Sequence, residues 1–392
     1  MNRPLWLLAT CQGLYLTNNV TFIAINGLVG LALAPVGWLA TLPVMGYVVG
    51  GALSTGLVAR TQQRWGRQAS FQAGLVVAML AALLCAYAAF SRNFWLLCTA
   101  TVVAGYYNAN AGLYRFAAAE LVDAPAREKA VSLVMAGGLL GAVVGPNLAA
   151  RTRDLFPVPF AGAYLALAVV ALLSMALMAF LRFPPAPPRA SVAAGRPLGE
   201  LMRQPVFIVA AAAGALSYGV MNLLMAATPI AMQQCGLPFG DAALVLEWHV
   251  IGMFAPGFFT GSLIKRFGAL PVMGAGVALN VACIAVALSG VDLQQFLVAL
   301  FLLGVGWNFL FTGSTTLSLS TYRPEERDKA QGALNFFVMA TLALSSLASG
   351  VLVTTSGWNL LNWGSLLPVV VTAAALLWLA LRERRAPVGG AA

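Results

Sequence analysis

The chain has 392 residues, of which 60% are hydrophobic and only 9% are charged. Soluble domains carry roughly 25% charged residues, so this composition excludes a water-soluble surface. The net charge of +10 does not indicate nucleic-acid binding, because the Lys and Arg residues stand in short loops between apolar stretches rather than on one face.

Apolar stretches of about 20 residues, each long enough to cross a hydrocarbon core of about 30 Å, follow one another along the chain. Their backbone groups must be hydrogen-bonded within each segment, which favours α-helices. The alternating pattern of a membrane β-barrel is absent. We predict twelve transmembrane helices with these bounds: 5–33, 36–59, 69–91, 94–116, 130–150, 160–181, 205–232, 242–264, 270–290, 293–318, 331–354 and 358–381.

One long polar stretch divides these spans six and six. Residues 182–204 contain five prolines among several arginines. We therefore expect an N-terminal six-helix bundle in 1–181, a cytoplasmic linker in 182–204 and a C-terminal six-helix bundle in 205–392.

Basic residues are distributed unevenly between the two sides that twelve spans imply. The side with both termini holds most of them, and the other side holds only Arg92, Arg151 and Arg153. By the positive-inside rule, both termini lie in the cytoplasm. We expect a multi-pass protein of a bacterial inner (plasma) membrane. The five cysteines show no paired spacing that would indicate a disulfide framework.

Two pairs of charged loops repeat between the halves. Arg127-Glu128-Lys129-Ala130 precedes the fifth span and Arg327-Asp328-Lys329-Ala330 precedes the eleventh. Arg64-Trp65-Gly66-Arg67 follows the second span and Lys265-Arg266-Phe267-Gly268 follows the eighth. Repeated loops at equivalent places are typical of duplicated transporter halves.

Over essentially its whole length the chain resembles the major facilitator superfamily. Gly66 and Arg67 match part of that superfamily's G-x-x-x-D-R-x-G-R-[RK] signature, although its usual acidic residue is missing. The resemblance implies an all-α membrane protein with twelve helices in two pseudo-symmetric six-helix bundles. Gly137-Gly138, Gly141 and Gly145-Pro146 resemble the Gly-Pro motif of its exporters, but this spacing also serves close helix packing.

Polar groups inside a membrane are costly and are usually functional. Glu247, the one acidic residue placed inside a predicted span, is a candidate for proton coupling. Arg115, at the end of the fourth span, is expected to snorkel to the cytoplasmic face.

Methionine and histidine recur at helical spacing in the seventh and eighth spans. Met221 and Met225 are four residues apart, as are His249 and Met253, so each pair shares one helix face. If the two faces meet, three thioethers and an imidazole converge, a ligand set that suits Cu(I). The alternatives are that the methionines fill the core and that His249 is a hydrogen-bonded structural group or a proton carrier.

The stretch 217–268 resembles the CcoA-type (CalT) copper importers. Their M-x-x-x-M motif on helix seven and H-x-x-x-M motif on helix eight fall on Met221, Met225, His249 and Met253. The resemblance implies import of copper, as Cu(I), by alternating access, to supply cytochrome oxidase assembly. The subfamily also uses cysteines, which makes Cys235, just beyond the seventh span, a candidate for the capture of copper.

Two other functions stay open. Related RfnT-type proteins move riboflavin, so the cargo is alternatively riboflavin or another planar solute held by aromatic and Asn side chains. The Gly-Pro motif instead suggests a proton-coupled exporter of drugs or metabolites. Packing and interhelical hydrogen bonding are the competing roles for the candidate cavity residues Asn18, Asn19, Asn26, Asn108, Asn110, Asn222, Asn308, Tyr106, Tyr107 and Trp307.

No nucleotide-binding loop and no catalytic constellation is present in the sequence. We therefore expect neither ATP coupling, nor an enzyme activity, nor a cofactor, with copper or the small molecule acting only as transported substrate. A monomer in the lipid bilayer, with no nucleic-acid partner, is the expected state.

Overall fold

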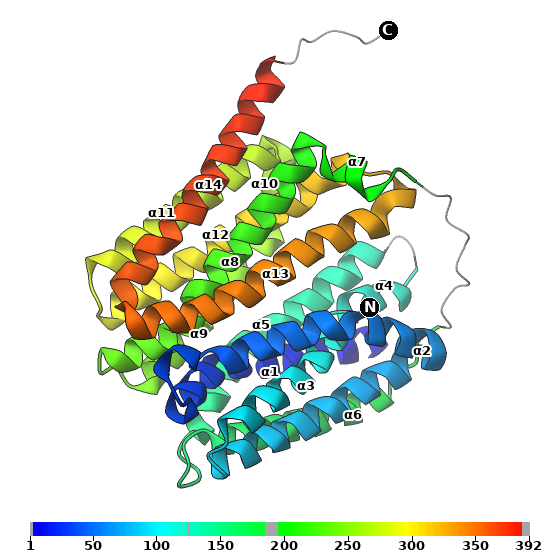
Figure 1. Ribbon diagram of the computed structural model, residues 1–392. Helices are drawn as coiled ribbons and strands as arrows, with labels where there is room; N and C mark the ends of the chain where they lie inside the picture. The colour runs from blue at the N-terminus through cyan, green and yellow to red at the C-terminus, as the bar shows by residue number, and fades with distance from the viewer. Residues whose placement is uncertain (1–2, 124–125, 185–194, 386–392) are drawn as a thin grey trace.

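The computed structural model describes residues 3–123, 126–184 and 195–385, which are mostly helical and contain no β-strand (Figure 1). The first half contains α1 (Arg3–Leu33), α2 (Leu42–Phe90), α3 (Phe94–Ala111), α4 (Tyr114–Glu120), α5 (Arg127–Thr152) and α6 (Ala161–Ala179). The second half contains α7 (Leu198–Met202), α8 (Pro205–Gln234), α9 (Phe239–Phe254), α10 (Gly257–Phe267), α11 (Ala269–Ser289), α12 (Leu293–Ser318), α13 (Arg327–Thr355) and α14 (Gly357–Arg385).

The chain turns back at a glycine at the equivalent place in each half. Gly66, within α2, has φ 80° and ψ 172°, so α2 is two membrane-crossing helices. Gly268, between α10 and α11, has φ 88° and ψ 164°. A residue with a side chain rarely takes such a positive φ. The loops that repeat in sequence therefore also share a backbone conformation, which makes the halves pseudo-symmetric at this point.

Two crossings are interrupted helices. The eighth consists of α9 and α10, which are separated at Ala255–Pro256, where proline lacks the amide that would continue the helix. The fourth consists of α3 and α4, separated at Gly112–Leu113. With each pair counted as one crossing and α2 as two, the described helices cross twelve times. The predicted all-α fold of twelve helices in two bundles is thereby confirmed.

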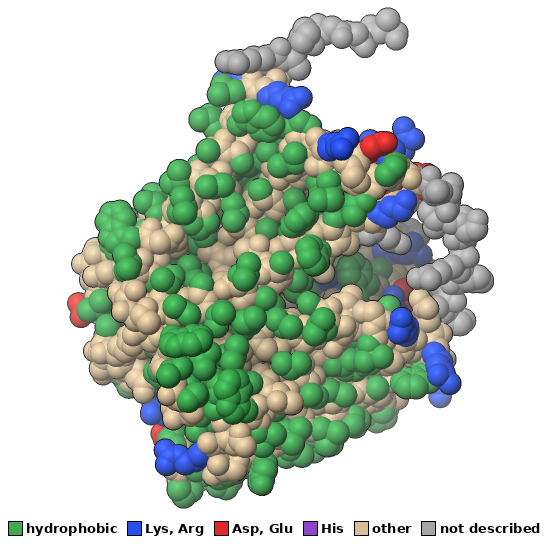
Figure 2. Space-filling model, in the orientation of Figure 1, with side chains coloured by type: hydrophobic (Ala, Val, Ile, Leu, Met, Phe, Trp, Pro, Cys, Tyr) green, Lys and Arg blue, Asp and Glu red, His purple; other side chains and the backbone are tan. Residues whose placement is uncertain are grey.

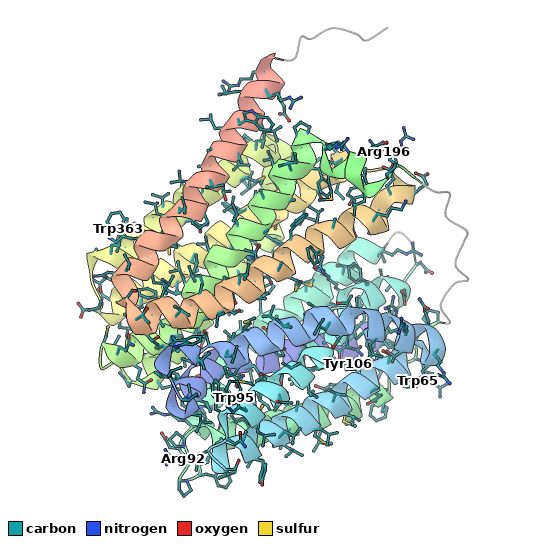
Figure 3. The ribbon with its side chains drawn as sticks, viewed as in Figure 1. Trp65, Arg92, Trp95, Tyr106, Arg196 and Trp363 are labelled. Atoms are coloured by element: carbon teal, nitrogen blue, oxygen red, sulfur yellow. The ribbon has the colours of Figure 1, made fainter. Side chains whose placement is uncertain are left out.

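The two bundles lie side by side, with 185–194 of the predicted linker outside the described residues (Figure 1). Figure 3 places Trp65 and Arg196 at one end of the molecule and Arg92 and Trp95 at the other. We call the first the basic end, because most Lys and Arg residues of the sequence belong to it, and the second the opposite end. The prediction that the basic end faces the cytoplasm rests on this asymmetry alone.

Described ion pairs at the basic end join residues of the same half. Arg67, from the signature loop, donates from Nε to Glu120 Oε2 at 2.7 Å, within the first half. Arg196 donates from Nη2 to Glu326 Oε2 at 2.7 Å, which fixes the end of the linker to the second half. Glu326 also accepts from the backbone amide of Arg323. The Arg196 guanidinium, followed by this amide, holds the pKa of Glu326 well below its usual range and keeps it charged.

Glycines of the fifth span bring α5 against the backbone of α1. A Cβ added at Gly141 would lie 2.5 Å from the carbonyl oxygen of Gly13, and one added at Gly13 would lie 2.8 Å from that of Gly137. The spacing that resembles an exporter motif therefore serves close helix packing here, whatever the direction of transport.

We expect Gly141→Ala to destabilise the protein by about 1–3 kcal/mol, because the added methyl group overpacks the α1–α5 contact. The measurement is the thermal unfolding midpoint in detergent. Gly56→Ala is the matched control, since a Cβ at Gly56, also within a helix, would meet nothing within 4 Å. If the two variants unfold at the same temperature, the contact does not stabilise the fold.

Candidate functional site

At the opposite end, side-chain hydrogen bonds join the two halves. Thr41, just before α2, donates from Oγ1 to the carbonyl oxygen of Ser346 at 2.6 Å and accepts from the backbone amide of Gly350 at 2.9 Å, both in α13. Asn147 of α5 donates from Nδ2 to Glu247 Oε2 of α9 at 2.7 Å. The proton-coupling candidate is thus bonded to an amide of the other half.

Aromatic rings complete this contact. Phe160, before α6, and Phe239, at the start of α9, meet edge to face with centroids 4.9 Å apart. The Arg153 guanidinium lies 5.4 Å from the Phe160 centroid and 5.9 Å from the Phe239 centroid. We refer to the contacts of Thr41, Asn147, Glu247, Phe160 and Phe239 as the seam, which closes the opposite end.

At the basic end the halves separate. Figure 2 shows a hollow between them on the side where Lys and Arg gather. None of the three ion pairs among the described residues joins one half to the other. A cavity that opens at the basic end and is closed by the seam is the geometry of one state of an alternating-access transporter.

The first half contains a set of hydrogen-bonded polar side chains on α1, α2 and α3, which we call the polar wall. Tyr15 of α1 donates its hydroxyl hydrogen to Asn108 Oδ1 of α3 at 2.6 Å. Asn19, one turn further along α1, donates from Nδ2 to Asn108 Oδ1 and to the Tyr47 hydroxyl, both at 3.3 Å. Tyr15, Asn19 and Asn108 are each half-buried. Two of the asparagines expected to line a cavity therefore lie together, with two tyrosines that sequence analysis missed.

The second half contributes an aromatic wall. Trp307 and Phe311, one turn apart on α12, stack with centroids 5.2 Å apart and an interplanar angle of 9°. Tyr218 of α8 meets Trp307 edge-on at 5.1 Å, and Phe254 of α9 lies 6.3 Å from it. Tyr15 and Tyr218 stand on α1 and α8, which contact each other, so the two walls belong to neighbouring helices of the two halves.

Trp307 differs from the other buried tryptophan of the chain. The Trp358 indole donates from Nε1 to the carbonyl oxygen of Ala287 at 3.2 Å. Trp307 is only 6% exposed, and its Nε1–H has no acceptor among the described residues. Because buried indole N–H groups usually find a partner, this orphan donor marks Trp307 as a candidate to bind a solute.

The other asparagine candidates make bonds between or within helices. Asn222 donates to Ser345 and Ser346 of α13, each at 2.9 Å. Asn308 donates to the carbonyl oxygen of Met253 at 2.7 Å and accepts from Thr260. Asn26 accepts a hydrogen bond from the Tyr164 hydroxyl, and Asn110 donates to the carbonyl oxygen of Ser70. Asn18 is buried beside Tyr47.

The two tyrosines proposed with Trp307 for stacking are enclosed in the first half. Figure 3 shows Tyr106 near the centre of this half. Its hydroxyl oxygen lies 3.2 Å from the hydroxyl oxygen of Thr61. Tyr107 packs edge-on against Tyr15 at 5.7 Å. Of the three proposed aromatic residues, only Trp307 belongs to the aromatic wall.

The candidate copper ligands are buried in the second half. Met221, Met225 and Met253 belong to one buried cluster. His249 is fully buried, and its Nδ1 lies 2.7 Å from the carbonyl oxygen of Leu300 in α12, so this nitrogen carries the hydrogen. His249 Nε2 has no partner among the described residues.

Cys235, the candidate capture thiol, is exposed just past the end of α8. Partial burial raises its pKa. Since the thiolate is the form that binds metal, this environment does not favour capture.

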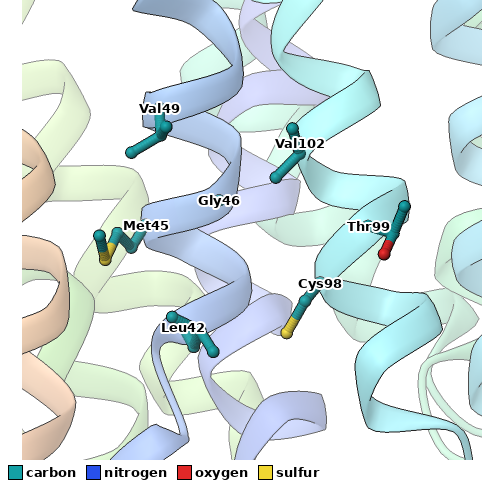
Figure 4. Close-up of a pocket in the computed structure, with 7 residues that line it drawn as sticks. All are labelled: Leu42, Met45, Gly46, Val49, Cys98, Thr99 and Val102. Carbon is teal, nitrogen blue, oxygen red and sulfur yellow. The ribbon is translucent and has the colours of Figure 1, made fainter.

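A separate groove lies within the first half, between α2 and α3 (Figure 4). It encloses about 440 Å³ and is lined by Leu42, Met45, Gly46, Val49, Cys98, Thr99 and Val102. Except for the Thr99 hydroxyl and the weakly polar Cys98 thiol, its side chains are apolar. It therefore offers little to orient a polar solute.

Comparison with known proteins is consistent with this architecture. The family model of the Major Facilitator Superfamily matches residues 5–246 and 210–391. The chain belongs to this superfamily. It is a multi-pass membrane transporter.

Full-length relatives carry transporter names. The riboflavin transporter RfnT of Brucella anthropi is 40% identical over 393 aligned residues, which cover 100% of this chain and 98% of that protein. The uncharacterized MFS-type transporter YddS of Bacillus subtilis is 27% identical, with 86% of this chain and 82% of that protein covered.

Solved structures share the fold. The nucleoside transporter NupG superposes with a TM-score of 0.76 at 12% identity, covering 96% of this chain and 99% of that one. A bacterial homolog of the human lysosomal transporter Spinster, in an inward-facing and unoccupied conformation, gives a TM-score of 0.70 at 14% identity over 98% of both chains.

We expect Thr41→Val to open the seam more often, because it removes the hydroxyl that bonds to the carbonyl of Ser346 and to the amide of Gly350 in the other half. A loss of about 1–2 kcal/mol raises the open population about 5- to 30-fold. The measurement, in a Cys235→Ser background that removes the exposed native thiol, is the rate at which an impermeant thiol reagent labels Ile230→Cys, a buried position where α8 meets Gly27 of α1.

Thr99→Val is the matched control, since this exposed hydroxyl bonds only to its own helix at Trp95. Equal labelling rates in the two valine variants would contradict a role for Thr41 in closing the seam.

Proposed function

We propose that this transporter moves riboflavin, or a closely related planar heteroaromatic solute, by alternating access. The aromatic wall carries the proposal, because the orphan Trp307 Nε1–H stands among rings able to pack against a planar solute. The full-length relative named as a riboflavin transporter supports it independently.

The chemistry of a flavin matches the two walls. Its fused rings pack against Tyr218 and Phe311, which are half-buried. Aromatic pairs contribute about 0.5–1.5 kcal/mol each beyond the burial of their area. Its ribityl chain, rich in hydroxyl groups, bonds to the amides of Asn19 and Asn108. As the cavity closes around the solute, a flavin carbonyl accepts from Trp307.

We infer the two states of the transport cycle from whether the seam is closed or open. In the described state the seam is shut and the cavity is open at the basic end, where solute enters or leaves. The reverse state requires the Thr41 and Asn147 bonds to part while the ends of the halves that carry Arg67 and Arg196 come together. With the basic end in the cytoplasm, as the positive-inside rule predicts, the described state delivers imported solute.

We expect cells that produce this chain to take up riboflavin, and Trp307→Phe to raise the KM of uptake. Phe keeps an aromatic ring but lacks the N–H, and one neutral hydrogen bond is worth about 0.5–1.5 kcal/mol, or roughly 2- to 12-fold in affinity. The measurement is initial-rate uptake of radioactive riboflavin.

Trp358→Phe is the matched control. It also removes a buried indole N–H, but that group bonds to Ala287 and lies outside the aromatic wall. Its KM should equal that of the wild type, after correction for the amount of protein in the membrane. No riboflavin uptake by the wild type would refute the proposed cargo.

Copper import is the second candidate, and one observation favours it. Among the described residues, His249 Nε2 is a buried nitrogen without a partner, in a half where three methionines are buried in one cluster. Imidazole and thioether ligands suit Cu(I). Riboflavin ranks first because the relative named for it covers the whole chain, whereas the resemblance to copper importers covers 217–268.

Met221→Leu and Met225→Leu distinguish the two cargoes, since leucine conserves volume but cannot ligate. Copper and riboflavin uptake are measured side by side. If riboflavin is the cargo, both variants transport it at near wild-type rates and none of the three proteins accumulates copper. Copper uptake by the wild type that either substitution abolishes would instead establish the thioether site.

A further inference from the structure

A second apolar groove lies on the second half, among α10, α11 and α12. It encloses about 250 Å³ and is lined by the apolar side chains of Leu263, Phe267, Pro271, Val272, Ala275 and Phe309. Three of these residues, Phe267, Pro271 and Ala275, are exposed. We refer to this feature as the α10–α12 groove, which opens on the surface of the molecule.

The α10–α12 groove faces away from the cavity. Successive residues of an α-helix are turned by about 100°, so Phe309 lies on the face of α12 opposite to Trp307 and Phe311, which belong to the aromatic wall. In Figure 1, α10 and α11 lie on the side of the second half that is remote from the first half. The groove is therefore on the outer side of the bundle, where a membrane protein meets acyl chains.

Two cations stand at the end of this groove. Lys265 and Arg266 are exposed in the last turn of α10. The Arg266 guanidinium lies 5.2 Å from the centroid of the Phe267 ring, which lines the groove. A printed contact thus places this charge against the wall of the groove, at the basic end of the molecule.

No carboxylate balances this charge. Residues 248–291, which include α10 and α11, contain no Asp or Glu, and α12 contains none either. The ion pairs among the described residues do not involve Lys265 or Arg266. Two unpaired cations at the end of an apolar groove complement a molecule with an anionic head and an apolar tail.

We propose that the α10–α12 groove is a binding site for an anionic phospholipid. The phosphate of the headgroup lies against Lys265 and Arg266, and one acyl chain lies along Phe267, Ala275 and Phe309. Basic pockets between helices on the cytoplasmic side of membrane proteins bind anionic headgroups, and a guanidinium binds phosphate through two parallel N–H donors. The site does not depend on the cargo, because it lies on the outer face of the bundle.

The test is native mass spectrometry of the purified full-length chain in detergent. The chain is titrated with phosphatidylglycerol and, separately, with phosphatidylcholine of the same acyl chains, and the Kd of the first bound lipid is measured. The charge variant is Lys265→Gln/Arg266→Gln. Its matched control is Arg382→Gln/Arg384→Gln, which also removes two exposed cations. Arg382 likewise lies 5.5 Å from an exposed ring, that of Trp378, but this ring does not line the groove.

We expect wild type to bind phosphatidylglycerol more tightly than phosphatidylcholine. Lys265→Gln/Arg266→Gln should raise the Kd for phosphatidylglycerol by roughly 30-fold, or about fivefold for each cation near a membrane surface. Its Kd for phosphatidylcholine should change less, because that headgroup has no net charge. The control double variant should bind phosphatidylglycerol like wild type.

A second pair of variants tests the groove itself. Ala275→Trp fills the groove, whereas Ala374→Trp adds the same ring at an exposed position of α14 outside it. Only Ala275→Trp should weaken phosphatidylglycerol binding, by roughly fivefold, since about ten carbon–carbon contacts to the acyl chain are lost. Both variants should unfold at the wild-type temperature without added lipid. If Ala275→Trp unfolds earlier, the comparison is made between Ala275→Leu and Ala374→Leu.

Equal Kd values for the two lipids in wild type, or equal losses in the two charge variants, would overturn the proposal, because the charge at Lys265 and Arg266 would then select no headgroup. Equal losses in the two variants at Ala275 and Ala374 would overturn it as well, because the acyl chain would then lie outside the groove.

Discussion

Inside hydrocarbon a polar group without a partner costs several kcal/mol, and this constraint explains most polar residues in the spans. Asn222, Asn308 and Asn110 each bond to a group on a neighbouring helix or at the adjoining turn. The carboxylate of Glu247 is bonded to Asn147. The Trp307 Nε1–H is among the buried polar groups without a partner in the described residues, and under the proposed function its partner arrives with the cargo.

The sequence predicts the helices well because their cause is local. Each apolar run satisfies its own backbone, so length and composition are sufficient to place the crossings. The two turns also have a local cause, and both lie in the loops that repeat in sequence. Glycine adopts the positive φ observed at Gly66 and Gly268 without strain. The break at Gly112–Leu113 was not predicted, although Asn108, Asn110 and Gly112 are weak helix formers.

The candidate site was harder to predict because it depends on distant pairings. Asn222 is bonded to groups more than 100 positions away, and Asn147 lies 100 positions from Glu247. No spacing rule distinguishes Asn108, which is half-buried and bonds to Tyr15, from Asn110, which bonds to Ser70. Two features of the sequence could have identified Tyr218 and Phe311 as site residues. Both are aromatic residues within largely aliphatic spans, and Phe311 follows Trp307 by one helical turn.

The cargo shows the limit of a short motif. Four residues at helical spacing suggested copper, yet methionine is also ordinary core filler, and the three methionines lie in a buried apolar cluster. The two walls contain a wider set of residues, namely aromatic rings and amides. Under the proposed function, recognition of a flat organic molecule uses that larger set.

The composition of the seam has a consequence for the free energy of its opening. The described bonds that cross it pair a hydroxyl with backbone groups, an amide with a carboxylate, and ring with ring; no cation faces an anion across it. Its opening therefore separates no pair of opposite charges in a medium of low dielectric, where such separation is most costly. Glu247, half-buried at this end of the molecule, exchanges its amide partner for water as the halves part. The free-energy cost of opening the seam itself should consequently depend little on ionic strength.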